Sequence, residues 1–478
     1  MSKVVVIGAG LTGLSVAYHL EKNNFFDYKI FEKNSLPGGL LRSVKHDGFT
    51  FDYTGHLLHI SSPYFFDFLN EIAGLQHFDL ITRKSSIFSN NVLTNYPFQI
   101  NLKGLSAQVI YECIDGFIKR KKSIHSPKNF HEWVLKYFGS GIGKHFLFPY
   151  NKKMQNYDLK KITPDWTGRF VPKTDLKNII FGAIESDPKT KIGYNAQFYY
   201  PKKDGIQFLI NKLSQKITNH IYTDHEVEFI DLMKKTIYFT NGYAQRFEKL
   251  ITTMPLDNFL KSLNDQNLNK ASKNLLCNSV LNFNIGFNKS DISNNHWIYF
   301  PEKQFNFYRV GFWNNISENS VPKNCSGIYG EVSYNKNLIK IKLKSILDKS
   351  TEQALKFLNL NSSNIVTKNI LNIEHAYVIY DKWRQQNLNK VLNQLKVFNI
   401  NSIGRYGAWK YSSMQEAVLD AKTTVDDILK LKQTKKSLTV MPAAEFNINK
   451  SSYLFVAKKG LRRDKRNLKG VRGNEATK

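Results

Sequence analysis

Three glycines near the N-terminus have the spacing that binds the pyrophosphate of a dinucleotide. Gly8, Gly10 and Gly13 follow an apolar run that ends at Ile7, and a helix-like stretch follows them. In this pattern the first glycine permits a tight turn, the second lets a pyrophosphate approach the backbone, and the third lets the helix pack closely on the strand. The free N–H groups at the start of that helix favour an anion. The pattern therefore predicts a dinucleotide site.

A second predicted strand, residues 28–32, ends in an acid. Glu32 stands where a dinucleotide fold places the carboxylate that binds a ribose. Gly38, Gly39 and Arg42 follow, and this loop resembles the flavin-binding signature of amine-oxidase-like flavoproteins. The glycines would let the loop pass close to the phosphates of FAD, and the arginine would add positive charge. The alternative for this loop is an ordinary surface turn.

The elements predicted along the chain place these motifs in one nucleotide fold that two insertions interrupt. Residues 106–190 read as mainly helical, with turns at 139–141 and at Pro149, and residues 279–380 alternate in the manner of an antiparallel sheet. The predicted class is α/β: an FAD-binding Rossmann-like domain with an inserted helical domain and an antiparallel-sheet domain. The predicted ranges are 1–105, 191–260 and 381–431 for the FAD-binding domain, 106–190 for the helical insert, 261–380 for the sheet domain and 432–478 for a basic tail.

The composition excludes several classes of protein. The chain has 478 residues and 42% hydrophobic residues, which is globular and argues against wholesale disorder. Cys113, Cys277 and Cys325 lie far apart, so no metal site and no disulfide framework is expected, and a reducing compartment fits. The sequence contains no membrane-spanning apolar run and no signal peptide, so a cytoplasmic location is expected.

The positive charge gathers in part at the C-terminus. Lysine and arginine number 68 against 39 acids, a net charge of +29. Residues 432–436 and 458–466 are strongly basic, and such a tail could hold anionic lipid headgroups or another polyanion and so bring the protein to a membrane surface. The alternative is a solvated, disordered tail. No specific nucleic acid is expected as a partner.

Further motifs make the sequence resemble the UDP-galactopyranose mutases, particularly their eukaryotic-type branch, within the amine-oxidase-like FAD superfamily. The glycine motifs alone would indicate only that superfamily, and the middle and late motifs are more specific. The resemblance implies the same three-part fold. Its motifs are residues 51–56 (FDYTGH), 96–99 (YPFQ), 132–133, 139–142 (GSGI), 149–153 (PYNKK), 166–168 (WTG), 252–257, 297–301 (WIYFP), 307–309 (FYR), 404–407 and 409–411.

The resemblance implies a flavoenzyme, an isomerase of polysaccharide biosynthesis. It would interconvert UDP-galactopyranose and UDP-galactofuranose, or a related nucleotide-sugar, through an adduct between the sugar and N5 of reduced FAD. The FAD would be bound non-covalently, with NAD(P)H as the reductant. Arginines suit such a site because their planar fork binds a diphosphate with bidentate bonds. Tyrosines suit it because a phenol donates to phosphate while its ring packs on sugar or base.

The resemblance also assigns roles to individual residues. His56, beside the isoalloxazine, and Arg309, on the diphosphate, are the candidate catalytic residues. Arg309 lies in an aromatic strand, where a buried arginine needs a partner. The candidate substrate-binding residues are Tyr299, Arg309, Tyr377, Tyr411, Asn151, Trp166 and Arg169. The candidate cofactor-binding residues are Gly8, Gly10, Thr12, Gly13, Glu32, Lys33, Gly39, Leu40, Arg42, Gly55, His56, Val227, Gly404, Arg405 and Met414.

Three positions depart from the family pattern. Thr54 replaces the first glycine before the histidine, and Gln155 replaces a tryptophan. Phe170 falls where the family has a second diphosphate arginine, with Arg169 one residue earlier. A one-residue offset on a strand reverses the face to which a side chain points. These departures concern the substrate and not the FAD.

Two other functions stay open. An amine-oxidase, protoporphyrinogen-oxidase or desaturase-like enzyme would take a hydride from its substrate and would be reoxidised by oxygen or a quinone. A binding or scaffold protein would work through its charge. A diphosphate pocket built from Arg309, Tyr299, Tyr377 and Tyr411 would favour the mutase.

Overall fold

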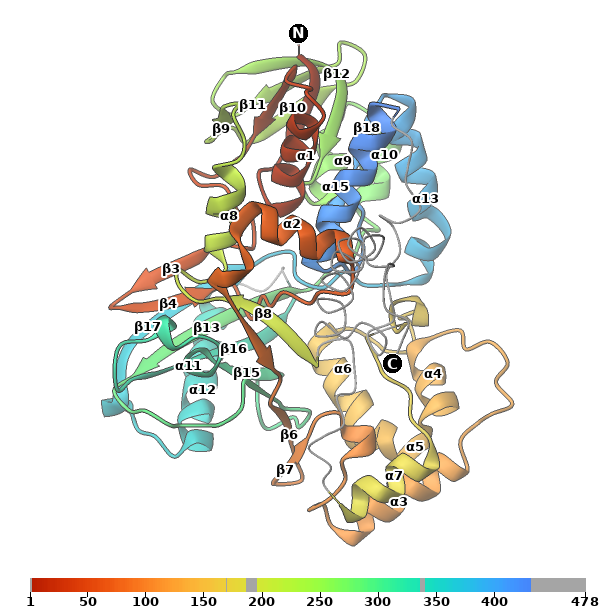
Figure 1. The fold of residues 1–478 in the computed structure, drawn as a ribbon. Coiled ribbons are helices and arrows are strands. Elements are labelled where there is room, and N and C mark those ends of the chain that lie inside the picture. The colour runs from red at the N-terminus through yellow and green to blue at the C-terminus, as the bar shows by residue number, and fades with distance from the viewer. Residues whose placement is uncertain (1, 169, 186–195, 336–339, 431–478) are drawn as a thin grey trace, which may run out of the picture.

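The computed structural model describes residues 2–168, 170–185, 196–335 and 340–430. Arg169 and the basic tail, residues 432–478, lie outside these described residues. The described chain forms three bodies, which are a nucleotide-binding sheet with its helices, a second sheet and a group of helices (Figure 1). No helix within the described ranges is both long and apolar enough to cross a membrane.

The nucleotide-binding sheet forms around the apolar N-terminal strand. Strand β1 (Ser2–Ile7) pairs in parallel with β2 (Tyr28–Phe31) on one side and with β12 (Ala244–Thr252) on the other. Successive residues Val4, Val5 and Val6 are all fully buried, as expected for a strand covered on both faces. The strand order is β10-β11-β12-β1-β2-β9, with β18 also on β12. The other bounds are β9 (Ile221–Tyr222), β10 (Val227–Asp231), β11 (Thr236–Phe239) and β18 (Ile400–Ser402).

Eight helices of the described chain belong to this part of the molecule, and the α/β class with a Rossmann-like domain is as predicted. Helix α1 begins directly after the glycine turn and packs on α15, the last helix described. The bounds are α1 (Leu11–Lys22), α2 (Pro63–Ala73), α8 (Gln207–Ser214), α9 (Leu256–Lys261), α10 (Gln266–Ser272), α13 (Lys382–Val397), α14 (Gly404–Gly407) and α15 (Met414–Ile428).

The helical body agrees with the predicted helical insert, and of the two turns expected inside it only the one at Pro149 is wrong. Helix α4 ends at Tyr137, the chain turns at Phe138 and at Gly139, whose φ is +79°, and from Gly139 it stays helical to Gln155. Pro149 lies in the first turn of α6, where a missing N–H is tolerated. A Cβ on Gly141 would lie 1.9 Å from the carbonyl oxygen of Glu112, so these glycines serve backbone contact between α3 and α5. The bounds are α3 (Ala107–Ile118), α4 (Phe130–Tyr137), α5 (Gly139–Ile142), a π-helix (Gly143–Leu147), α6 (Phe148–Gln155) and α7 (Leu176–Ile184).

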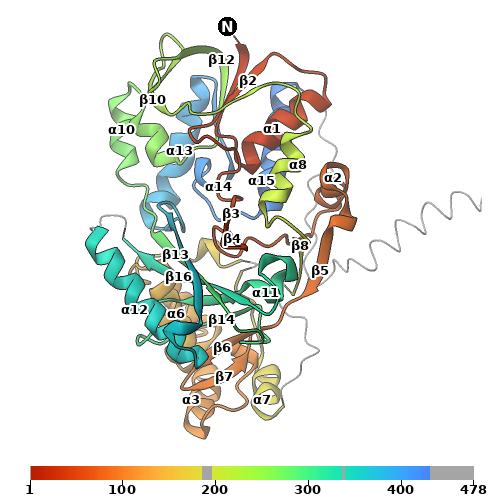
Figure 2. The same cartoon turned by 90° about the vertical axis from the view of Figure 1, so that its left-hand side faces the viewer.

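The second sheet has the strand order β17-β13-β16-β15-β14-β6-β7. Its pairs are antiparallel except for β14 and β6, which run in parallel. Strands β6 and β7 come from before the helical insert, so this sheet combines segments from both sides of it. Helix α12 lies beside this sheet (Figure 2). The bounds are β6 (Ser85–Ser89), β7 (Val92–Asn95), β13 (Ser279–Phe287), β14 (Trp297–Tyr299), β15 (Arg309–Phe312), α11 (Trp313–Ile316), β16 (Ser326–Tyr334), α12 (Lys340–Leu358) and β17 (Ile365–Ile373).

Two short strand pairs join the bodies, and one carboxylate holds them together. Asp52 is fully buried at the end of β4. It accepts hydrogen bonds from Ser43 Oγ at 2.6 Å, from Tyr200 Oη at 2.6 Å and from the Ile206 backbone N at 3.2 Å. Burial raises its pKa to about 6. Asp52 thereby fixes the root of the loop that carries His56. The bounds are β3 (Ser43–His46), β4 (Phe49–Asp52), β5 (Phe78–Thr82) and β8 (Gln197–Pro201), with 3-10 helices at Leu75–His77, Phe98–Ile100, Pro164–Trp166, Glu318–Ser320 and Ser362–Asn364.

Candidate active site

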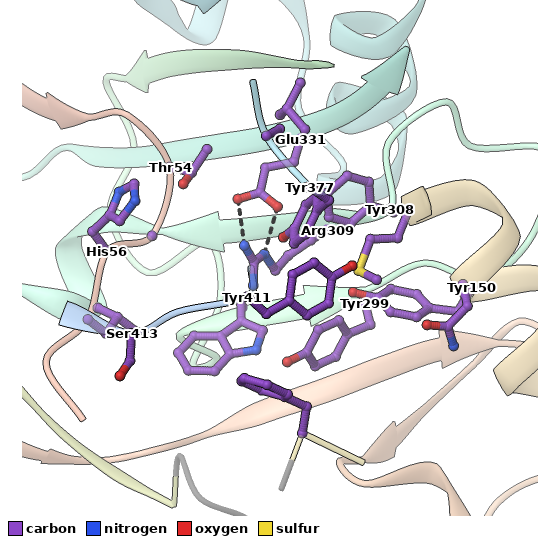
Figure 3. Close-up of a pocket in the computed structure, with 18 of the residues that line it drawn as sticks. Thr54, His56, Tyr150, Tyr299, Tyr308, Arg309, Glu331, Tyr377, Tyr411 and Ser413 are labelled. Atoms are coloured by element: carbon purple, nitrogen blue, oxygen red, sulfur yellow. Dashed lines mark hydrogen bonds and ion pairs between the residues drawn. The ribbon is translucent and has the colours of Figure 1, made fainter. Parts of the chain in front are cut away.

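A cavity of about 340 Å³ lies between the two sheets and the helical body, and it gathers residues from distant parts of the chain (Figure 3). Eleven of the residues predicted from the sequence line it, with substrate and flavin candidates side by side. They are Leu40, Gly55, His56, Asn151, Trp166, Tyr299, Arg309, Tyr377, Arg405, Tyr411 and Met414. Of the predicted substrate residues, only Arg169 cannot be placed, because it lies outside the described residues.

Arg309 has a partner that the sequence analysis missed. Its Nε donates to Glu331 Oε2 at 2.9 Å and its Nη2 donates to Glu331 Oε1 at 2.6 Å (Figure 3). The Glu331 side chain is 1% exposed and that of Arg309 is 20% exposed. Burial lowers and the carboxylate raises the pKa of Arg309, and the net shift is upward. The signal was present in the sequence, because an acid in the middle of the apolar strand β16 needs a partner.

Phenols surround this ion pair. Burial raises the pKa of Tyr308 and Tyr377, so both stay protonated at neutral pH and can donate hydrogen bonds. Tyr299 stands beside Tyr150 with ring centroids 5.4 Å apart. Tyr308 belongs to the FYR motif, residues 307–309, but its place in the site was not predicted. The lining tyrosines that it did not assign are Tyr96, Tyr150, Tyr308, Tyr329 and Tyr406.

His56 reaches the cavity from a loop with an unusual backbone. Burial, together with the positive charges of Arg405 and Arg309, lowers the pKa of His56 to about 4, so its ring is neutral at pH 7. A Cβ on Gly55 would lie 2.4 Å from the hydroxyl of Tyr329, so that position accepts only glycine without a shift. Thr54 has a φ of +75°, which is a strained conformation for a β-branched residue.

Thr54→Gly should therefore stabilise the protein. Strain of this kind costs about 1–3 kcal/mol. Glycine also has more conformational freedom in the unfolded chain, which reduces the gain in stability by about 0.4–1 kcal/mol. We expect the free energy of unfolding to rise by about 1 kcal/mol in a urea titration. Asparagine tolerates a positive φ, so the free energy of unfolding of Thr54→Asn should lie between those of the wild type and of Thr54→Gly. A lower urea midpoint for Thr54→Gly than for the wild type would contradict the assigned strain.

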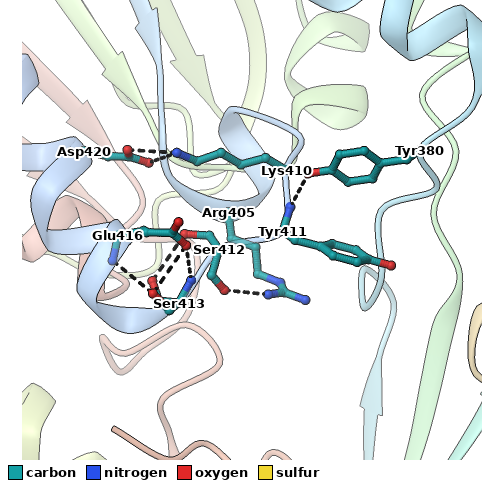
Figure 4. A network of polar contacts seen from close by, with 8 residues as sticks. All are labelled: Tyr380, Arg405, Lys410, Tyr411, Ser412, Ser413, Glu416 and Asp420. Carbon is teal, nitrogen blue, oxygen red and sulfur yellow. Dashed lines mark hydrogen bonds and ion pairs between the residues drawn. The ribbon is translucent and has the colours of Figure 1, made fainter. Parts of the chain in front are cut away.

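Arg405 brings a second positive charge to the cavity. Its Nη1 donates to the Ser412 carbonyl oxygen at 2.8 Å (Figure 4). Its guanidinium lies 5.8 Å from the ring centroid of Tyr411. No carboxylate pairs with Arg405 among the described residues, so its charge is not neutralised there. Ser413 and Glu416 form a capping box that begins α15 and holds this loop in place.

The glycine turn forms a cradle with the features of an anion site. No side chain caps the first turn of α1, and that turn holds no acid. Gly8 has a φ of +95°, and a Cβ on Gly10 would meet nothing closer than 3.7 Å. Glu32 is buried, accepts from the Ala9 backbone N at 2.9 Å and so stabilises the turn. These groups fit the pyrophosphate and ribose of a dinucleotide.

The remaining predicted cofactor residues lie around this cradle or near it. Gly404 has a φ of +79° and lies against Thr12, because a Cβ on Gly404 would be 2.6 Å from Thr12 Oγ1. Arg42 donates from Nε to the Gly39 carbonyl oxygen at 3.0 Å. Lys33 is exposed just after β2, and Val227 begins β10. Because Gly404 lies against the cradle and the next residue, Arg405, lines the cavity, the two sites adjoin. The described residues contain no group of three or more His, Cys, Asp or Glu side chains placed to hold a metal ion.

Two of the departures from the family pattern meet at one tyrosine. Phe170 lines the cavity and its ring lies edge-on to Tyr411, with centroids 6.0 Å apart. Gln155 is 1% exposed and lies behind the cavity wall, where its Nε2 donates to Tyr411 Oη at 2.6 Å. Both substitutions are therefore accommodated around the same phenol.

The fold and its resemblance to known proteins agree with the sequence analysis. Residues 6–72 match the model of the NAD(P)-binding Rossmann-like domain. The structure superposes on a crystal structure of reduced UDP-galactopyranose mutase with a TM-score of 0.85 and 27% sequence identity, covering 91% of this chain and 97% of that one. The predicted resemblance to these mutases and the predicted three-part fold are confirmed.

Curated relatives share shorter stretches with the chain. The dTDP-fucopyranose mutase of Escherichia coli is 24% identical over 234 residues, which is 48% of this chain and 56% of that protein. Protoporphyrinogen oxidase 2, chloroplastic/mitochondrial, of Arabidopsis thaliana is 27% identical over 250 residues, which is 45% of this chain and 48% of that protein. The chain thus spans about half the length of these two relatives. Both likenesses agree with the prediction of an enzyme, mutase-like with an oxidase-like alternative.

Proposed function

We propose that this protein is an FAD-dependent mutase of a nucleoside diphosphate sugar, which interconverts UDP-galactopyranose and UDP-galactofuranose or a related pair. The observation that carries the proposal is Arg309. Two of its five N–H groups bind Glu331, so three are left for a ligand in the cavity. Phenols that can only donate to a phosphate surround it. A diphosphate in the cavity would satisfy all of these donors.

The chain's own residues would then perform three tasks. Arg309 binds the diphosphate and stabilises its negative charge as it leaves the sugar. Tyr299, Tyr377 and Tyr411 donate hydrogen bonds and hold the nucleotide in place, and Trp166 covers one side of the cavity. Closure of the site by these rings holds the sugar against the cofactor and excludes water.

FAD is supported by the glycine cradle and by the cavity beside it. When bound and reduced, the flavin would supply N5 as the nucleophile toward the anomeric carbon of the sugar. His56, neutral at pH 7, would lie at that reacting edge without adding a charge. The reductant that we propose is NAD(P)H, in a cytoplasmic setting where thiols such as Cys277 stay reduced.

The second candidate is an oxidoreductase that removes a hydride from its substrate. The likeness to the Arabidopsis protoporphyrinogen oxidase favours it. Against it stand the three remaining N–H groups of Arg309 and the row of phenols, which an apolar substrate would leave without partners inside the cavity. The mutase is therefore the better account of the site.

The test is to incubate the dithionite-reduced holoenzyme with UDP-galactofuranose and to follow UDP-galactopyranose by chromatography. We expect interconversion without net consumption of reductant, and none with the oxidised enzyme. dTDP-fucopyranose, offered in parallel, reports the tolerance for a sugar without the 6-hydroxyl. Flavin reduction by a porphyrinogen or an amine, with no interconversion of either sugar, would favour the oxidoreductase.

A further inference from the structure

Gln155 is buried behind the cavity but reaches its wall through one hydrogen bond. It is the last residue of α6 and is 1% exposed. Its backbone is held by Asn278, whose Nδ2 donates to the Gln155 carbonyl oxygen at 3.1 Å. The Oδ1 of Asn278 accepts from the backbone N of Tyr377 at 2.8 Å. Gln155 therefore sits on a fixed frame that also carries one of the cavity's tyrosines.

The bond from Gln155 sets the polarity of the Tyr411 hydroxyl. Gln155 Nε2 donates to Tyr411 Oη at 2.6 Å, so the phenol oxygen acts there as an acceptor. A hydroxyl carries one hydrogen, which must then point elsewhere. The hydroxyl donates no hydrogen bond to the part of the chain that the structure describes, where Gln155 Oε1 is also left without a partner, and Tyr411 lines the cavity. The hydrogen is therefore available to a ligand there.

The Tyr411 ring itself has little freedom. Its centroid lies 5.0 Å from that of Tyr380, 5.6 Å from that of Trp166 and 6.0 Å from that of Phe170. The Tyr411 backbone N donates to Tyr380 Oη at 2.8 Å (Figure 4). With the ring and backbone held, rotation of the hydroxyl is the remaining freedom, and Gln155 controls it.

We propose that Gln155 is a positioning residue that makes Tyr411 a dedicated hydrogen-bond donor to the ligand's phosphate. A phosphate oxygen only accepts, so a phenol whose hydrogen is already directed into the cavity binds it without reorganisation. Such a donor suits this chain because Phe170 supplies no charge at the position where the family pattern has an arginine. This inference rests on the proposed function of the cavity and assigns the control of one of its donors.

The first arm measures UDP affinity of the FAD-loaded enzyme by calorimetry. We expect Gln155→Leu to weaken UDP binding roughly five- to tenfold, the usual effect of one hydrogen bond. Tyr411→Phe should weaken it by at least as much. In the Tyr411→Phe background, Gln155→Leu should add less than about twofold, since it acts through the missing hydroxyl. Equal losses in both backgrounds would overturn the proposal.

A matched control removes another buried amide away from the cavity. Gln245 on β12 is 6% exposed, and its Nε2 donates to the Arg246 carbonyl oxygen at 2.7 Å. Gln245→Leu should lower the thermal midpoint as Gln155→Leu does, yet leave UDP affinity unchanged. If it weakens UDP as much as Gln155→Leu, the effect of Gln155 is only structural and the proposal falls.

The second arm needs no ligand. The enzyme is labelled with ¹³Cζ-tyrosine, and the Tyr411 signal is assigned by its absence in Tyr411→Phe. Gln155→Leu should shift that signal, whereas Gln245→Leu should not. An unshifted signal overturns the hydrogen bond and with it the proposal. A shifted signal in an enzyme that binds neither UDP nor pyrophosphate upholds the control of Tyr411 and rejects the proposed function of the cavity.

Discussion

Replacing Arg309 by methionine should abolish turnover and weaken UDP binding roughly 100-fold, the effect of about 3 kcal/mol in charge-assisted hydrogen bonds. The same change leaves the carboxylate of Glu331, which is 1% exposed, without its partner. Breaking a buried ion pair in this way costs about 3–5 kcal/mol of stability. The thermal midpoint and the UDP affinity should therefore fall together, as measured by calorimetry on the holoenzyme.

A double variant separates the two effects. Arg309→Met with Glu331→Gln removes both charges, so most of the lost stability should return. UDP affinity should stay low, because the donors to the diphosphate are still missing. If the double variant binds UDP as the wild type does, Arg309 acts only through the fold. An Arg309→Met enzyme with unchanged UDP affinity would contradict the diphosphate assignment directly.

Replacing Gly13 or Gly10 by alanine should have different effects, with a large loss of stability expected only for Gly13. A Cβ on Gly13 would lie 1.8 Å from the carbonyl oxygen of Gly8, so α1 would be forced away from β1. We expect Gly13→Ala to lower the free energy of unfolding by about 3 kcal/mol. FAD should be lost with it, since the cradle is deformed. Urea unfolding and the 450 nm absorbance of the purified protein measure both effects.

Gly10→Ala is the matched comparison. Its Cβ would be 3.7 Å from the nearest atom, Gly39 Cα, which is ordinary contact. The apoprotein should therefore keep its stability within about 1 kcal/mol, the scale of an N-cap change. The methyl group would stand where a pyrophosphate approaches, so FAD affinity should fall roughly tenfold or more, equal to about 1.4 kcal/mol. Normal FAD binding by Gly10→Ala would place the cofactor elsewhere.

The nucleotide-binding half could be predicted from the sequence because its signals are local. Gly8, Gly10 and Gly13 act within one turn, and a run of β-branched valines that ends at a glycine turn favours a strand covered on both faces. The parallel pairing of β14 with β6 was beyond prediction, since residues 297–299 and 85–87 lie far apart in the sequence. The turn expected at Pro149 was misread because this proline lies in the first turn of a helix, where its missing N–H is tolerated.

The site divides in the same way. Residues inside specific motifs, such as Arg309 and Tyr411, were placed in the cavity as expected. Glu331 was missed because its role depends on the register between β15 and β16, which pairs it with Arg309. Gln155 was noted only as a departure, since a hydrogen bond between residues 155 and 411 leaves no trace in local sequence. The local residue pattern therefore does not reveal contacts between residues that lie far apart in the sequence.

The place of β1 in its sheet has a consequence for synthesis on the ribosome. β1 ends at residue 7, and its partner β12 begins at residue 244, which is 244 − 7 = 237 residues later. At roughly 5–20 residues per second, one edge of this valine-rich strand waits about 12–50 s for its neighbour. An unpaired apolar edge is a template for aggregation during that time. The nascent chain should therefore depend on chaperones until β12 has emerged.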